Sequence, residues 1–216
     1  MPRPDYFTAG GRDLRLDLLR GFMVFVMIVD HVGGDSPLGF LTGGNRFFAS
    51  AAEGFVLISG LMTGLVYGRI VQRSGMRVGL GKLLTRAVAL YALTVTVTLL
   101  FILFSERTGM PWAKQIDLGN PGAFVISIFA LRQTYFLVDV PLLYTLLFVC
   151  APAAFALLHW GKGWLVLVIS GLVYSLYQFV PGLIVFPWPI AGNNLFNFAA
   201  WQLLFFSALW LGYNQS

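Results

Sequence analysis

The chain has 216 residues, of which 58% are hydrophobic and only 11% are charged, and its mean hydropathy is +0.79. A soluble domain carries about 25% charged residues, so this composition predicts a polytopic membrane protein. Much of the formal net charge of +5 comes from one stretch that contains no acidic residue, with the cations Arg69, Arg73, Arg77, Lys82 and Arg86. This pattern between two apolar runs is typical of a cytoplasmic loop and excludes a nucleic-acid partner.

The N-terminal part, Met1–Gly11, is polar and is expected to lie in the cytoplasm before the first helix. The apolar run Gly21–Val29 has the length of a signal-peptide core, but the residues after it read DHVGGD and offer no A-x-A-like cleavage site. We therefore expect a retained first helix. The single cysteine, Cys150, sits in an apolar run and is expected to pack, and the chain shows no metal-ligand cluster.

The first helix is predicted over Leu14–Val32 and carries four ionisable groups, Asp17, Arg20, Asp30 and His31. Such groups are costly at membrane depth and indicate a functional site, unless they lie at the two membrane surfaces. Arg20 and His31 are eleven residues apart, so they share one helix face at a separation of about 16 Å along the axis. Alternatively, Arg20 forms a structural pair with Asp17.

The second helix is predicted over Phe47–Tyr67, after a Gly-rich turn at Gly33–Asn45 that makes the first two helices antiparallel neighbours. Glu53 then lies at the outer depth of His31, so the two side chains can converge. The hydroxyl of Ser59 is expected to bond the carbonyl one turn back. Three glycines at four-residue spacing predict close packing against another helix: Gly60, Gly64 and Gly68.

Further along the chain, Ser105–Gly122 is predicted as an outer loop, and Ala123–Leu131 is too short to cross a bilayer. We expect that segment to be interfacial or re-entrant, followed by Arg132. Four more helices are predicted from the apolar runs: Ala87–Phe104, Val140–Leu158 with a kink at Pro152, Trp164–Val180 and Phe196–Tyr213. The expected architecture is one all-α transmembrane domain, 1–216, of about six helices with a cytoplasmic N-terminus.

Several motifs give the chain a family resemblance. LDLLRG, followed after nine residues by Asp30 and His31, resembles the opening of the membrane-bound acyltransferase-3 superfamily, and AEGFVLISG resembles that superfamily's second-helix element. RLDLLRG, DHVGG, NRFFASAAEGFVLISG, VDVPLLY and FNFAAWQLLF are closest to the OpgC-type proteins. Those proteins are inner-membrane enzymes of bacteria that succinylate osmoregulated periplasmic glucans.

This resemblance implies an O-acyltransferase that moves an acyl group, succinyl in that family, from a cytoplasmic acyl-CoA to glucan hydroxyls. His31 matches the catalytic histidine, and either Glu53 or Asp30 is expected to orient it. Acyl-CoA is a co-substrate, and no bound cofactor is expected. Since family members have about ten helices, the chain is expected to be an N-terminal portion. The candidate substrate-binding residues are Arg20 and Arg86 for the donor phosphates, Arg46 or Arg132 for a succinyl carboxylate, and Asp139.

Two other classes of function stay open at this point. In a proton-coupled transporter or flippase, His31, Glu53 and Asp139 would relay protons or bind a solute, but no inverted repeat is evident. A chain that lacks the later helices of the family could instead be an inactive fragment.

Overall fold

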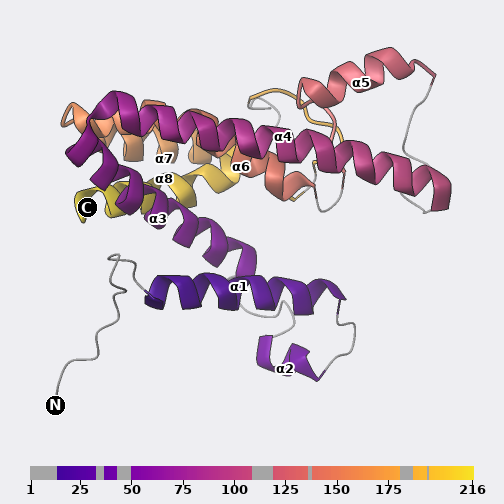
Figure 1. The fold of residues 1–216 in the computed structure, drawn as a ribbon, viewed down its shortest axis with the longest axis horizontal. Helices are drawn as coiled ribbons and strands as arrows, with labels where there is room; N and C mark the ends of the chain where they lie inside the picture. Colours follow the sequence, from indigo (N-terminus) through magenta and orange to yellow (C-terminus); the bar gives the residue numbers. More distant parts are fainter. Residues whose placement is uncertain are drawn as a thin grey trace.

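The computed structural model describes residues 14–32, 37–42, 50–108, 119–135, 138–180, 187–193 and 195–216. Within these ranges the chain is all-helical, which confirms the predicted class (Figure 1). The helices are α1 (Leu14–Val32), α2 (Leu38–Thr42), α3 (Ala51–Ser74), α4 (Met76–Thr108), α5 (Pro121–Phe129), α6 (Asp139–His159), α7 (Gly163–Phe179) and α8 (Phe198–Asn214).

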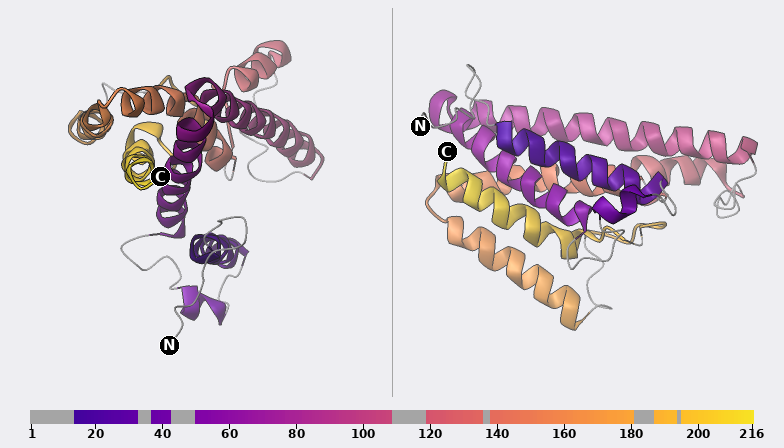
Figure 2. Two further views of the ribbon diagram at one scale, coloured as in Figure 1. Left: turned by 60° about the vertical axis from the view of Figure 1, so that its left-hand side comes forward. Right: turned by 90° about the horizontal axis from the view of Figure 1, so that it is seen from below.

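Of the long helices, α1, α4 and α8 make most of the contacts with α3. This helix packs mainly on α8, while α4 packs on α6 and α7 packs on α8. Helix α1 contacts chiefly α3 and the short α2, and it lies beside α3 in the ribbon views (Figures 1 and 2). The first helix is therefore attached to the bundle mainly through α3.

Three helices of the described part, α3, α4 and α6, are long and apolar enough to cross a membrane by length and composition. Helix α7 is a shorter apolar helix of 17 residues. Large apolar side chains also point outward along α4 and α7, among them Phe104, which is 66% exposed, and Phe179, which is 84% exposed. These features are compatible with a membrane protein. The expected six spans and the side of the N-terminus stay predictions.

The predicted glycine packing face of α3 is confirmed. A side-chain carbon at Gly60 would overlap the backbone oxygen of Phe205, and one at Gly64 would overlap that of Leu209. On α8, Gly212 lies equally close to the backbone of Leu61. Small residues let two backbones approach in this way, and the contact fixes α3 against α8.

The contact between α4 and α6 contains a buried polar pair. The hydroxyls of Thr94 and Thr145 lie 3.1 Å apart, and each also lies within hydrogen-bond distance of a carbonyl one turn back in its own helix, so one hydroxyl donates to the other and the second donates to its carbonyl. Both side chains are about 1% exposed. Because every hydroxyl here has a partner, the pair joins the helices without leaving an unsatisfied group in the core.

The prediction of a basic loop between Arg69 and Arg86 is wrong. Helix α3 continues to Ser74 and α4 starts at Met76, so Gly75 alone separates them, with a φ of 87°. Arginine and lysine are good helix formers, and nothing in this stretch except Gly75 interrupts a helix. The five cations therefore lie on the ends of two helices that meet at a corner.

The other helix bounds differ less from the prediction. Helix α1 has the predicted ends, and α6, α7 and α8 begin and end within two residues of theirs. The second predicted helix starts four residues late, because Ser50 and Glu53 form a capping box at its start. The predicted turn at Gly33–Asn45 contains the helical turn α2. Pro152 lies inside α6, which continues through it. Helix α5 has nine residues and is too short to cross a bilayer.

Candidate functional site

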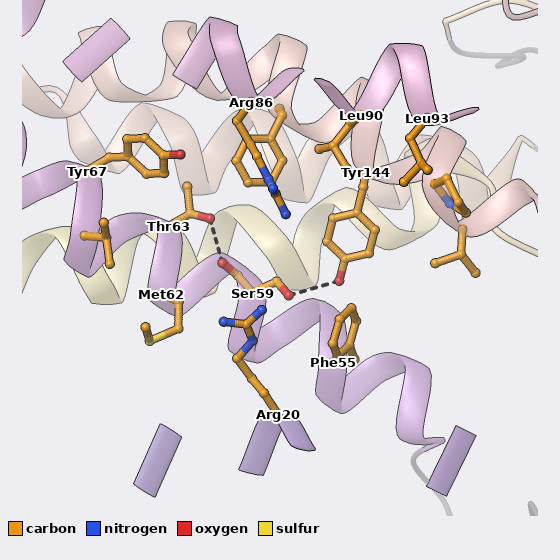
Figure 3. Close-up of a pocket in the computed structure, with 14 residues that line it drawn as sticks. Arg20, Phe55, Ser59, Met62, Thr63, Tyr67, Arg86, Leu90, Leu93 and Tyr144 are labelled. Carbon is orange, nitrogen blue, oxygen red and sulfur yellow. Dashed lines mark hydrogen bonds between the residues drawn. The ribbon is translucent and has the colours of Figure 1, made fainter. Parts of the chain in front are cut away.

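A pocket of about 330 Å³ lies between α1, α3, α4 and α6. Its walls are mostly apolar, with side chains such as Phe55 and Met62 of α3, Leu90 and Leu93 of α4, and Phe148 of α6 (Figure 3). Helix α3 supplies the longest wall, from Phe55 to Tyr67. The face of α3 that lines the pocket is distinct from its glycine face, which is covered by α8.

One wall of the pocket carries a hydrogen bond between two helices. The phenol of Tyr144 on α6 donates to the hydroxyl of Ser59 on α3, over 3.2 Å. One turn further along α3, the hydroxyl of Thr63 donates to the backbone oxygen of Ser59 over 2.7 Å. The ring of Tyr144 also meets Phe55 edge to face, with centroids 5.7 Å apart. These contacts hold a small polar area in an otherwise apolar wall (Figure 3).

Two arginines reach this polar area from opposite sides. Arg20 extends from α1 and Arg86 from α4, and their guanidinium groups point toward Ser59 between them (Figure 3). The Nε of Arg20 is buried and has no hydrogen-bond partner in the described part of the chain. A buried N–H without a partner is costly, and it is available to a ligand that accepts a hydrogen bond.

The arrangement is suited to binding an anion. Two guanidinium groups that point toward the same polar area attract negative charge, and Arg20, which is partly buried, is screened less by water than an exposed cation would be. Guanidinium groups also match the geometry of phosphate and carboxylate oxygens. The pocket can therefore hold one anionic group of a larger ligand, with its apolar part against α3 and α4.

Comparison with known proteins gives one finding. The model of the family described as OpgC protein matches residues 12–216 of the chain. The chain belongs to the OpgC family. Neither the curated proteins nor the solved structures contain a significant match.

The structure of this OpgC family member brings together two arginines that were predicted to bind the phosphates of the acyl donor. Arg20 and Arg86 are 66 positions apart in the sequence, and both line the pocket. Asp139 begins α6, and the next two residues, Val140 and Pro141, line the end of the pocket. Asp139 itself is only 2% exposed and does not line the pocket.

Two of the predicted catalytic residues, Glu53 and Asp30, do not line the pocket. His31 is in the last turn of α1, and its side chain lies outside the described residues. The carboxylate of Glu53 accepts a hydrogen bond of 2.7 Å from the backbone N–H of Ser50, so it caps α3. Asp30 accepts a hydrogen bond of 2.9 Å from the hydroxyl of Thr42, which attaches α2 to α1. Each of these two carboxylates thus has a structural partner besides any role beside His31.

Of the two residues predicted for a succinyl carboxylate, the described one, Arg132, does not line the pocket. Arg46 lies outside the described residues. Arg132 is exposed in the segment after α5, where its backbone oxygen accepts a hydrogen bond from the N–H of Ala191. Among the described residues, no group of three or more His, Cys, Asp or Glu side chains is placed to hold a metal ion.

Tyr144 and Thr63 line the pocket but were not predicted to do so. The hydroxyl of Ser59 was predicted to bond the carbonyl one turn back in its own helix. The hydrogen bond found for Ser59 runs to another helix instead. Tyr144 ends the VDVPLLY motif, and Ser59 lies in the AEGFVLISG motif. Both motifs carried the family resemblance, and this was the only signal that could have singled out the two residues.

Proposed function

We propose that the chain is a membrane O-acyltransferase that moves a succinyl group from cytoplasmic succinyl-CoA to hydroxyls of a periplasmic glucan. The family match over residues 12–216 carries this proposal. The pocket supports it, because it offers two guanidinium groups to the anionic part of such a donor. The basic ends of α3 and α4 support a cytoplasmic location for that side of the pocket, by the positive-inside rule.

The proposed donor site uses Arg20 and Arg86 for the phosphates of coenzyme A. Arg20 lies about 16 Å from His31 along the axis of α1. An acyl-CoA is long enough to keep its phosphates at the arginines while its thioester reaches the other end of α1. Arg46 or Arg132 then supplies a cation for the free succinyl carboxylate.

In the proposed reaction, His31 acts as the general base. Its neutral imidazole accepts the proton of a glucan hydroxyl while the hydroxyl oxygen attacks the thioester carbonyl. The resulting tetrahedral adduct collapses, the carbon–sulfur bond breaks, and the thiolate of coenzyme A takes the proton back from the imidazolium. A carboxylate, Glu53 or Asp30, fixes the tautomer of His31 and stabilises the imidazolium.

The two histidines of the chain allow a matched test. His31→Ala should reach the membrane in normal amounts but leave the glucan without succinyl groups. His159→Ala, at the exposed end of α6, should leave succinylation unchanged. The succinyl content of glucans is measured in cells that express only one variant. Normal succinylation with His31→Ala would refute the assignment of the base.

A second experiment separates chemistry from transport. The purified 216-residue chain in detergent is given succinyl-CoA and glucan, with no membrane compartments present. Formation of succinyl ester, together with release of coenzyme A, supports the acyltransferase and excludes an inactive fragment. Absence of ester, with solute movement in sealed vesicles, would support a transporter instead.

A further inference from the structure

Positive charge is concentrated around the corner at Gly75, where α3 ends and α4 begins. Five cations lie between residues 69 and 86, and the sequence has no acidic residue between Glu53 and Glu106. All five side chains are exposed. Such a surface raises the local concentration of anions around it.

The cations on α3 continue a face that lines the pocket. Met62 and Val66 line the pocket, and Arg69 follows them at spacings of seven and three residues. Arg73 follows Val66 by seven residues and Arg69 by four. Residues at these spacings share one side of a helix. The face therefore runs from the pocket to the corner and changes from apolar to cationic along the way.

The first turns of α4 show the same continuation. Arg86, Leu90 and Leu93 line the pocket, and Lys82 precedes Arg86 by four residues on the same side of the helix. Arg77 differs, because nine residues before Arg86 correspond to two and a half turns. It therefore lies on the opposite side of α4, although it belongs to the same corner and is equally exposed.

We propose that Arg69, Arg73 and Lys82 form an approach surface that guides the polyanionic donor into the pocket. This inference rests on the proposed function, since it takes a coenzyme A thioester as the donor. The three cations attract its phosphates before binding, and Arg86 and then Arg20 receive them inside the pocket. The approach surface acts on the association rate, because its side chains lie outside the pocket that holds the bound phosphates.

The test measures binding of coenzyme A, which has no acyl group to transfer, to the full chain in phosphatidylcholine nanodiscs. Association and dissociation rates are compared for wild type, Arg73→Gln, Arg77→Gln and the triple variant R69Q/R73Q/K82Q. Arg73 and Arg77 are matched, since each is an exposed arginine two residues from Gly75. Thermal unfolding of each variant checks that the fold is intact.

At about 0.15 M ionic strength, where the Debye length is about 8 Å and cations on the far side of the helix are largely screened, we expect the triple variant to bind about tenfold more slowly, and Arg73→Gln about two- to threefold more slowly. Arg77→Gln should differ from wild type by less than about 1.5-fold, and all dissociation rates should agree. At about 1 M salt, where the Debye length is about 3 Å, the differences should disappear.

Three results would overturn the proposal while leaving the proposed function intact. Association could be equal in all variants, Arg77→Gln could slow it as much as Arg73→Gln, or the dissociation rate could change instead. Loss of retained anionic phospholipid from the triple variant, with unchanged association of coenzyme A, would also overturn it and assign the corner to lipid headgroups. If wild type binds no coenzyme A, the proposed donor is wrong, and this inference falls with it.

Discussion

The phenol of Tyr144 donates a hydrogen bond to the hydroxyl of Ser59, 85 positions earlier in the chain, at the point where Arg20 and Arg86 converge. This bond joins α6 to α3 across the wall of the pocket. Because the hydroxyl oxygen of Ser59 accepts this bond, the proton of the same hydroxyl does not point toward Tyr144. The polar area between the two arginines is thus fixed by one contact between helices.

The contribution of this hydrogen bond can be measured by a double-mutant cycle. Tyr144→Phe keeps the ring contact with Phe55, and Ser59→Ala keeps the helix, so each should lower the free energy of unfolding by about 1 kcal/mol. The double variant should lose little more than either single variant, because the two changes remove one bond. Thermal unfolding in detergent gives the four values.

Tyr91→Phe provides the control for that cycle. Its phenol donates to the backbone oxygen of Phe129 over 2.8 Å, in another part of the bundle. Its effect should therefore add to that of Ser59→Ala. Additive effects of Tyr144→Phe and Ser59→Ala would contradict the coupling between those two residues.

The arginines of the pocket should determine the affinity for coenzyme A. Loss of hydrogen bonds to a charged group costs about 1.5–3 kcal/mol, so Arg20→Gln should raise the Kd by roughly ten- to a hundredfold. Arg20→Lys should recover only part of this, because an ammonium cannot reproduce the planar fork. Arg107→Gln removes an exposed arginine near the far end of α4 and should change nothing. Equal Kd values for wild type and Arg20→Gln would refute the donor site.

Glu53 caps α3 and is proposed to orient His31, and one substitution separates the capping from the proposed role. A capping box accepts Gln as well as Glu, so Glu53→Gln should preserve the start of α3 and the free energy of unfolding. It removes the negative charge proposed to orient His31, and kcat should fall about tenfold or more. Glu53→Ala should lower stability as well, by about 1 kcal/mol. Full activity of Glu53→Gln would leave Glu53 with the capping role alone.

The close contact between α3 and α8 predicts a large effect of one methyl group. In Gly64→Ala the new carbon would overlap the backbone oxygen of Leu209 and lie 2.7 Å from the backbone nitrogen of Tyr213, so the two helices must separate. We expect a loss of about 1–3 kcal/mol in the free energy of unfolding. Gly171→Ala on α7 is the control, because no atom lies within 4 Å of its new carbon. Equal stability of the two variants would contradict the contact.

The sequence predicted the helices well where an apolar run ends at a charge, proline or glycine. Helix α1 and the last three helices are of this kind. It failed at the corner, where the hydrophobic run ends before the helix does. Positive charge marks the end of the apolar span, but arginine and lysine continue a helix into water without difficulty. Only Gly75 interrupts the backbone there.

The pocket was only partly predictable for a related reason. Sequence gives the depth of a residue along its own helix, so Arg20 and Arg86 were recognised as polar groups near one membrane surface. It does not give the rotation of one helix relative to another. The pairing of Tyr144 with Ser59 depends on that rotation, and helix packing across 85 positions sets it.

The glycine face of α3 also determines which walls of the pocket can move. Backbone touches backbone at Gly60 and Gly64, so α3 cannot slide or turn on α8 without a clash, and the two helices behave as one rigid unit. The buried threonine pair ties α4 to α6 in a similar way. Helix α1 has neither restraint, and it carries Arg20. We therefore expect a change in pocket width on ligand entry to involve a movement of α1 relative to α3.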